Sequence, residues 1–102
     1  ESGEFDFFFS APEPTKDLLK EGKFLTGTIN LLEQLSEKDF ETEKIKNQLW
    51  DFATQEGRAE VLWPMRVALT GQAKSPDPFT VASILGKKET LRRLKYAQKI
   101  LN

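Results

Sequence analysis

Four glycines divide most of the chain into short helical segments. Gly22, Gly57, Gly71 and Gly86 each follow a run in which apolar residues recur three or four positions apart. Glycine often ends a helix, because it adopts a left-handed backbone conformation there without a steric penalty. The pattern predicts an all-α fold, a compact bundle of about six short helices joined by short loops, over one domain of residues 1–102.

The helix boundaries follow from capping residues and prolines. Thr15, Thr42 and Ser75 are the expected N-caps, and Pro76 takes the first helical position of its segment, before Asp77. Pro64 argues against a strand in "LWPMRVAL" and suits an early helical position. We therefore expect helices over residues 16–21, 23–35, 42–56, 64–70, 76–85 and 88–101.

Two local features are expected to depend on packing. Gly27 interrupts its helix with the smallest side chain, which predicts a close contact with a neighbouring helix. Residues 1–14 are expected to be extended, because Pro12 and Pro14 oppose a helix and Phe7–Phe9 fit no amphipathic one. We expect these rings to pack on the helical body or on a preceding domain, to which residues 1–14 form the junction.

The chain contains no cysteine and no histidine. These absences exclude disulfides and the usual zinc sites, and they remove the commonest general base. The acidic residues show no converging spacing, so we expect no catalytic residue, no metal and no cofactor in this domain.

No apolar run approaches the roughly 20 residues that span a bilayer, and the lack of cysteine fits a reducing cytoplasm. We expect a cytoplasmic protein without a membrane partner.

Charge is divided unevenly along the chain. Residues 1–57 hold 6 Lys/Arg and 13 Asp/Glu, whereas residues 58–102 hold 9 and 3. This asymmetry favours an anionic partner for the C-terminal half, and a dipolar surface without a function is the alternative. The last expected helix is predicted to bury Leu91, Leu94, Ala97 and Leu101. On the opposite face lies a basic stripe, which we define as Lys88, Arg92, Lys95 and Lys99.

The basic stripe and Lys74 are the candidate contacts to a phosphate backbone, although a solvated helix face has the same pattern. Arg66 is more informative, because it lies in an apolar run that would bury its stem while the guanidinium reaches an edge. Its fork of donors suits a base edge or a phosphate. The alternative is a structural ion pair with Asp77 or Glu60.

The segment from Ser75 to Phe79, "SPDPF", follows within ten residues of Arg66. Its two prolines hold the turn in few conformations, which lowers the entropy that binding would cost. The start of the following helix would also present backbone N–H groups to an acceptor. An ordinary well-capped helix start has the same sequence, so the chemistry alone leaves both interpretations open.

Three motifs in this order carry a family resemblance. "PMRVALTG", "SPDPF" and "ILGKKETLRRLKYAQKIL" resemble the C-terminal anticodon-binding domain of bacterial-type glutamyl-tRNA synthetases, and the resemblance extends more weakly over nearly the whole chain. It implies an α-helical cage around the anticodon loop, in which Arg66 contacts one base. It further implies that Ser75, Pro76 and Phe79 line the pocket of a neighbouring base. Asp77 and Pro78 stand where the family has Gly and a base-contacting Leu.

The resemblance also implies what surrounds this domain. The parent would be a class I glutamate–tRNA ligase whose ATP and magnesium belong to a catalytic domain that precedes this chain, which has neither a "HIGH"-like nor a "KMSKS"-like motif. The implied partners are glutamate tRNA, with glutamine tRNA in a non-discriminating enzyme, and the attached N-terminal synthetase domains of a monomer. The alternatives are a helical protein-interaction module that uses the Phe cluster, a sequence-blind RNA-binding domain, and a free-standing enzyme, for which no site is seen.

Overall fold

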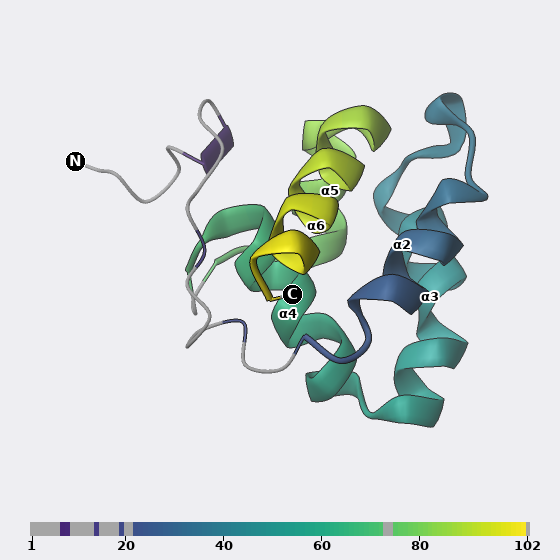
Figure 1. The fold of residues 1–102 in the computed structure, drawn as a ribbon. Coiled ribbons are helices and arrows are strands. Elements are labelled where there is room, and N and C mark those ends of the chain that lie inside the picture. The colour runs from purple at the N-terminus through teal and green to yellow at the C-terminus, as the bar shows by residue number, and fades with distance from the viewer. Residues whose placement is uncertain (1–6, 9–13, 15–18, 20–21, 73–74, 102) are drawn as a thin grey trace.

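The computed structural model describes residues 7–8, 14, 19, 22–72 and 75–101. These residues form five α-helices and one 3₁₀ turn, and no strand is found among them (Figure 1). The helices are α2 (Leu25–Glu33), α3 (Thr42–Glu56), α4 (Arg58–Thr70), α5 (Pro78–Leu85) and α6 (Lys87–Leu101), with the 3₁₀ turn η2 at Glu37–Asp39. The all-α prediction is confirmed, and about six helices is slightly too many for this part of the chain. The helix expected over residues 16–21 and most of the extended segment 1–14 lie outside the described residues.

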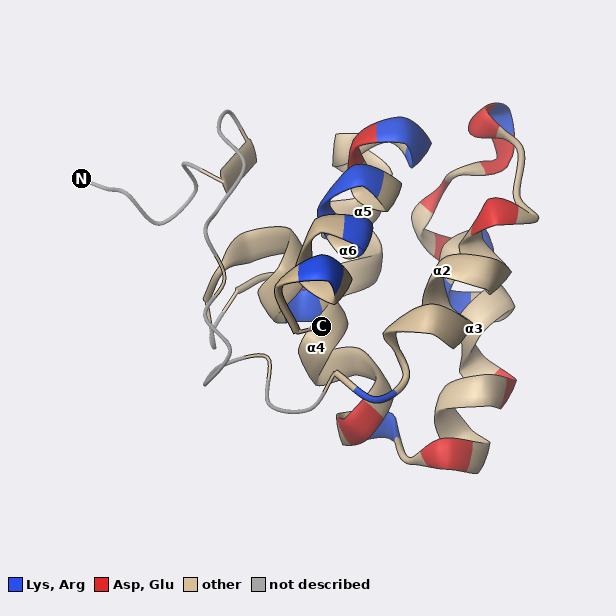
Figure 2. Ribbon diagram, in the orientation of Figure 1, with Lys and Arg blue, Asp and Glu red and all other residues tan. Residues whose placement is uncertain are grey.

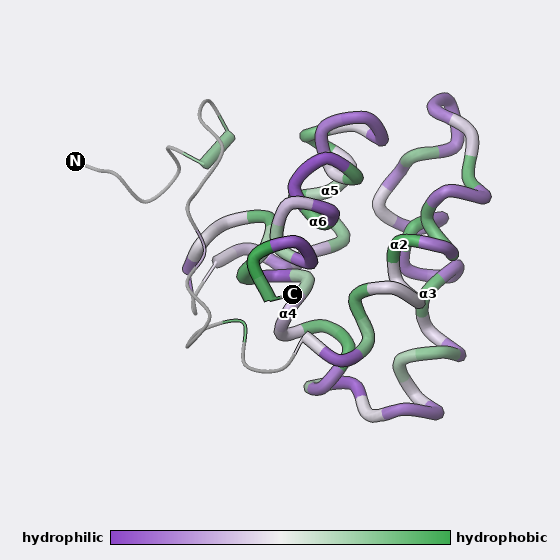
Figure 3. The backbone as a smooth tube through the Cα atoms, viewed as in Figure 1, coloured by the Kyte–Doolittle hydropathy of each residue, from purple (hydrophilic) through white to green (hydrophobic). Residues whose placement is uncertain are grey.

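The helices pack around one hydrophobic core. Figure 1 shows α2 and α3 together on one side of the molecule and α4, α5 and α6 on the other. Helix α6 contacts α2, α4 and α5, while α3 contacts α4 and α5. Hydrophobic residues recur along each helix, and hydrophilic ones cover the turns at both ends of α3 (Figure 3). Fully buried members of the core include Leu25, Leu32, Ile45, Leu49, Met65, Leu69, Leu94 and Ala97.

Helix α4 is longer than predicted. It begins at Arg58, six residues before the predicted start at Pro64, which is buried inside the helix. Gly57, with φ 112°, connects α3 directly to α4: its N–H donates to the Ala53 carbonyl at 2.9 Å and its carbonyl accepts from Val61 at 3.0 Å. Because the two helices share this residue, no loop separates them. The proline ring removes one backbone hydrogen bond of the helix, and the ring itself is buried.

Close packing explains the glycine inside α2. A Cβ atom on Gly27 would lie 2.5 Å from Cζ of Phe52 on α3. The Phe52 ring also meets Phe24 edge-on, with 5.8 Å between the ring centroids. The predicted close contact at Gly27 is therefore confirmed. Helix α2 itself is shorter than the predicted range 23–35 at both ends.

Candidate nucleic-acid interface

Arg66 connects α4 to the segment from Ser75 to Phe79, which we call the proline-rich turn. Its side chain is half-buried, and Nη1 donates a hydrogen bond to the backbone carbonyl of Ser75 at 3.0 Å. Within the described part of the chain, Arg66 pairs with neither Asp77 nor Glu60, so the alternative of a structural ion pair is not formed. A guanidinium carries five N–H donors. Nε and Nη2 have no partner among the described residues and can still bind a ligand.

The backbone around this arginine is fixed at the end of α4. The Thr70 hydroxyl donates to the Arg66 carbonyl at 2.8 Å and accepts from the N–H of Gln72 at 3.1 Å. Gly71 closes the helix in the left-handed conformation (φ 71°), and its N–H donates to Val67 at 2.7 Å. These bonds hold the carbonyl end of α4 in one geometry and leave little freedom for the Arg66 backbone. Lys74, an expected phosphate contact, lies outside the described residues.

Helix α5 begins two residues later than predicted. Asp77 is its N-cap: Oδ1 accepts from the Thr80 N–H at 2.8 Å and Oδ2 accepts from the Thr80 hydroxyl at 2.9 Å. Pro78 takes the first helical position. The predictions of Ser75 as the N-cap and Pro76 as the first helical residue are therefore wrong. The segment offers a capping residue before a proline twice, and Ser75 Oγ donates instead to the Pro76 carbonyl at 2.9 Å.

The other expected pocket residues lie at different depths. Ser75 and Pro76 are half-buried at the surface beside Arg66, whereas Pro78 and Phe79 are buried. The structure therefore brings Arg66, Ser75 and Pro76 together as the groups a ligand can contact. Phe79 supports the turn from the core side. Asp77, between Pro76 and Pro78, is exposed.

Three residues that the sequence reasoning missed extend this surface. The Trp50 ring of α3 meets the Phe79 ring edge-on, with 6.4 Å between centroids and 62° between planes. The Lys46 ammonium lies 5.1 Å from the centroid of the Trp50 ring, and Cζ of Arg58 lies 4.9 Å from it. The spacing of Lys46 and Trp50, four residues apart in one helix, was a usable signal. The contact between Trp50 and Arg58 depends on the α3–α4 junction and has no sequence signature.

The basic stripe is exposed on α6 as predicted, but part of its charge is already paired. Figure 2 shows Lys and Arg recurring along α6. Arg92 Nη2 lies 2.6 Å from Glu89 Oε2, and Lys95 Nζ lies 3.0 Å from Glu33 Oε2 on α2. The hydrogen bond from Arg92 contributes most to lowering the pKa of Glu89 to about 2, burial opposes it, and Arg93 adds to it. The stripe is therefore a weaker phosphate site than its composition predicts.

Arg93 is the one arginine of α6 that is buried, at 4% exposure. Its Nη1 donates to the Leu69 carbonyl in α4 at 2.8 Å, and its Nε donates to Glu89 at 2.7 Å. It thereby ties α6 to the last turn of α4, close in the helix to Arg66. Leu94 and Ala97 on the same helix are buried as predicted, whereas Leu91 and Leu101 are only partly buried.

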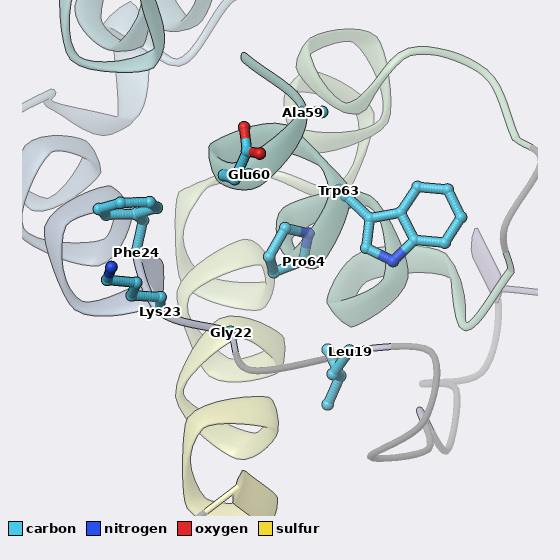
Figure 4. A pocket seen from close by; sticks show the side chains of 8 residues that line it. All are labelled: Leu19, Gly22, Lys23, Phe24, Ala59, Glu60, Trp63 and Pro64. Carbon is cyan, nitrogen blue, oxygen red and sulfur yellow. The ribbon is translucent and has the colours of Figure 1, made fainter. Parts of the chain in front are cut away.

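A pocket of about 360 Å³ lies elsewhere, between the segment that precedes α2 and the first turns of α4 (Figure 4). Figure 4 shows Lys23 and Phe24 facing Glu60 and Pro64 across it. None of the predicted site residues lines this pocket, whose residues are Leu19, Gly22, Lys23, Phe24, Ala59, Glu60, Trp63 and Pro64.

The described residues contain no group of acidic side chains arranged to hold a metal ion. None of the helices described has the length and apolar composition needed to cross a membrane.

Phe7 tests the expectation for the aromatic N-terminal segment. Its ring is buried, at 3% exposure, and belongs to the hydrophobic core of the described structure. Phe8 packs against it with 4.4 Å between ring centroids. Packing on the helical body, the first of the two expected arrangements, is therefore the observed one for Phe7. Phe9 lies outside the described residues.

Known proteins are similar to this chain in both sequence and fold. A family described as "Anticodon binding domain" matches residues 3–98. The chain is 34% identical over 100 residues to a glutamate–tRNA ligase of Christiangramia forsetii and 35% identical over 101 residues to one of Clostridium tetani. These matches cover 89% and 88% of this chain but only 19% and 21% of the relatives. The chain thus spans about a fifth of the length of these relatives.

A solved structure extends the similarity to three dimensions. The crystal structure of a glutamate–tRNA ligase from Elizabethkingia meningosepticum, in complex with its amino acid, matches 95% of this chain and 20% of its own. The TM-score is 0.81 at 27% sequence identity. The similarity therefore includes the arrangement of the helices that carry Arg66 and the proline-rich turn.

Proposed function

Because the chain belongs to the anticodon-binding domain family, we propose that it selects tRNA by its anticodon for a glutamate–tRNA ligase of which it forms the C-terminal part. The observation that carries this proposal is the hydrogen bond from Arg66 Nη1 to the Ser75 carbonyl. It holds a half-buried arginine against a rigid turn and leaves further guanidinium donors unused. A fork of donors fixed before binding loses little entropy when it meets a base.

Each residue of the site has a distinct role in this proposal. Arg66 donates to the polar edge of one anticodon base, and Ser75 and Pro76 form the side of the pocket for its neighbour. Phe79 supports the turn from within, and Trp50 packs against Phe79. Sequence-specific recognition of RNA relies on such contacts with unstacked bases in loops. Pro78 is buried, so it acts through the shape of the turn.

The chemistry of tRNA charging belongs to the rest of the parent protein in this proposal. ATP and magnesium are assigned to the catalytic domain, and this domain contributes the choice of tRNA. Glutamate tRNA is the proposed partner, with glutamine tRNA accepted if the parent is non-discriminating. We expect the parent to act as a monomer in the cytoplasm. Sequence-blind binding through α6 is less favoured, because Glu89 and Glu33 already pair two cations of the basic stripe.

The test is an NMR titration of the chain with two RNA hairpins. One is the anticodon stem-loop of glutamate tRNA, and the other has the same stem and a changed anticodon. We expect the 102-residue chain without substitutions, called the parent chain from here on, to bind the first hairpin more tightly. The NMR signals of Arg66 and residues 75–79 should shift. The Arg66→Ala substitution should weaken binding of the first hairpin by about 1–3 kcal/mol and remove the preference.

The matched control is Lys95→Ala, which removes a positive charge from α6. It should weaken both hairpins by the same small factor, because Glu33 already pairs with this lysine. Thermal unfolding of both variants verifies that the fold is intact. Equal affinity of the parent chain for the two hairpins would contradict anticodon selection.

A further inference from the structure

Two cations share one aromatic ring on the surface next to Phe79. Lys46 from α3 and Arg58 from the start of α4 are exposed, and each lies about 5 Å from the centroid of the Trp50 ring. Their charged groups are therefore no further apart than these two distances combined. Such cation–π contacts are worth roughly 0.5–1 kcal/mol each at exposed sites. The ring thus holds two positive charges near each other at little energetic cost.

Neither cation forms an ion pair with another described residue. In the part of the chain that the structure describes, Lys46 and Arg58 have no carboxylate within ion-pair distance. By contrast, Lys44 lies 3.0 Å from Asp39, and Arg92 and Lys95 have the partners given above. A side chain that rests on a ring face keeps its N–H donors for a partner at its edge. Lys46 and Arg58 are therefore available to an anion.

Trp50 links this pair of cations to the segment that contains the proposed anticodon site. Trp50 contacts Phe79, which supports the proline-rich turn. Along α4, Arg58, Leu62 and Arg66 form an i, i+4, i+8 row, so their side chains follow one face of the helix. An RNA strand whose base is bound at Arg66 would therefore pass along α4 toward Arg58.

We propose that Lys46 and Arg58, held on Trp50, form a phosphate-binding clamp for the RNA strand that flanks the bases read at Arg66. The clamp rests on the proposed function and adds a second binding site to it. It binds the backbone, so it contributes affinity without sequence preference. Continuity with the Arg66 turn favours RNA over an acidic protein as the partner.

The test is the salt dependence of hairpin binding by the full 102-residue chain. We would compare the parent chain with the double variant Lys46→Gln/Arg58→Gln, using both anticodon hairpins at several salt concentrations. The slope of log K against log salt is negative, and each lost phosphate contact in a single-stranded loop should reduce its magnitude by about 0.7. The preference for the glutamate anticodon should remain. Both residues are exposed, so the fold should tolerate the change.

Two further variants complete the design. Lys38→Gln removes an exposed positive charge from η2, and its salt slope should equal that of the parent chain. Trp50→Leu keeps both cations but removes their platform, and it should weaken both hairpins equally, whereas Trp50→Phe should bind like the parent chain. A double variant with the same salt slope as Lys38→Gln would overturn the clamp.

The two proposals fail in different ways. Equal binding of both hairpins by the parent chain overturns anticodon selection, whereas an unchanged slope in the double variant overturns only the clamp. The absence of any hairpin binding by the parent chain overturns both. A normal anticodon preference together with a reduced slope supports both.

Discussion

Replacing Glu89 by Gln tests the link between α6 and the C-terminal part of α4, the helix that carries Arg66. Glu89 accepts hydrogen bonds from Arg92 and from the buried Arg93, and Arg93 in turn holds the Leu69 carbonyl at the end of α4. Glutamine keeps the size of the side chain and removes its charge. Arg93 would then remain buried without an anionic partner, which is costly for a desolvated cation.

The size of the effect follows from the carboxyl group. The pKa of Glu89 falls from 4.5 to about 2, mainly through the hydrogen bond from Arg92, with burial opposing and Arg93 contributing. One pKa unit corresponds to about 1.4 kcal/mol, so the shift sets a ceiling of roughly 3.5 kcal/mol. Because 31% of the side chain is exposed, screening by water reduces this value. We expect Glu89→Gln to lower the free energy of unfolding by about 2 kcal/mol, or the Tm by about 10 °C.

The pH dependence identifies the cause. The folded pKa of Glu89 lies below the unfolded value, so its contribution is complete above about pH 4.5 and is lost as the pH falls through about 2. Denaturant unfolding of both proteins at pH 7 and near pH 2.5 measures the difference. The two stabilities should converge in acid, because protonated glutamic acid resembles glutamine. Equal destabilisation at both pH values would show that the loss comes from packing and would refute the electrostatic reasoning.

Two further substitutions test the helix contacts and the capping, with urea unfolding as the measurement. Gly27→Ala introduces a Cβ atom 2.5 Å from Cζ of Phe52, so we expect it to destabilise the fold by about 1–2 kcal/mol despite the higher helix propensity of alanine. Adding Phe52→Leu should recover part of the loss, and no recovery would contradict the contact. Asp77→Ala removes the cap of α5 and should cost about 1 kcal/mol, whereas Asp77→Asn should cost much less. An equal loss in both Asp77 variants would mean that the carboxylate charge, and not the cap, stabilises α5.

Local signals in the sequence predicted most of the fold. Helix α3 ends at Glu56 as predicted, but the prediction of Thr42 as its N-cap is wrong, because Glu41 takes the cap position without a side-chain hydrogen bond and Thr42 is already helical. Gly57, Gly71 and Gly86 each follow a helix with positive φ, as the glycine pattern predicted. The start of α4 could not be predicted in this way, because Gly57 serves two helices at once and Pro64 is tolerated only where the core covers it. The start of α5 was misplaced for a local reason: Ser75 and Asp77 both precede a proline, and Asp77 is the one whose side chain accepts from the Thr80 N–H.

The candidate site was predictable in composition but not in contacts. Arg66 and the turn that begins at Ser75 were identified from the sequence, whereas the bond from Arg66 to a backbone carbonyl nine residues later was not. A backbone acceptor has no residue type, so no motif can reveal it. Trp50 was missed because its partners come from three helices. The basic stripe was overrated, because the partner of Lys95 is Glu33, which is distant in the sequence.

Asp77 carries a negative charge where the family resemblance implies a glycine. The contacts of its carboxylate determine what this difference means. Both carboxylate oxygens accept hydrogen bonds from Thr80, one from the backbone N–H and one from the hydroxyl. The carboxylate therefore faces the positive end of α5, which offsets about half a charge. It does not pair with Arg66, so Nε and Nη2 of the guanidinium stay without a partner among the described residues. A negative residue next to a proposed RNA site is thus compatible with binding, because its carboxylate caps the helix that positions the turn.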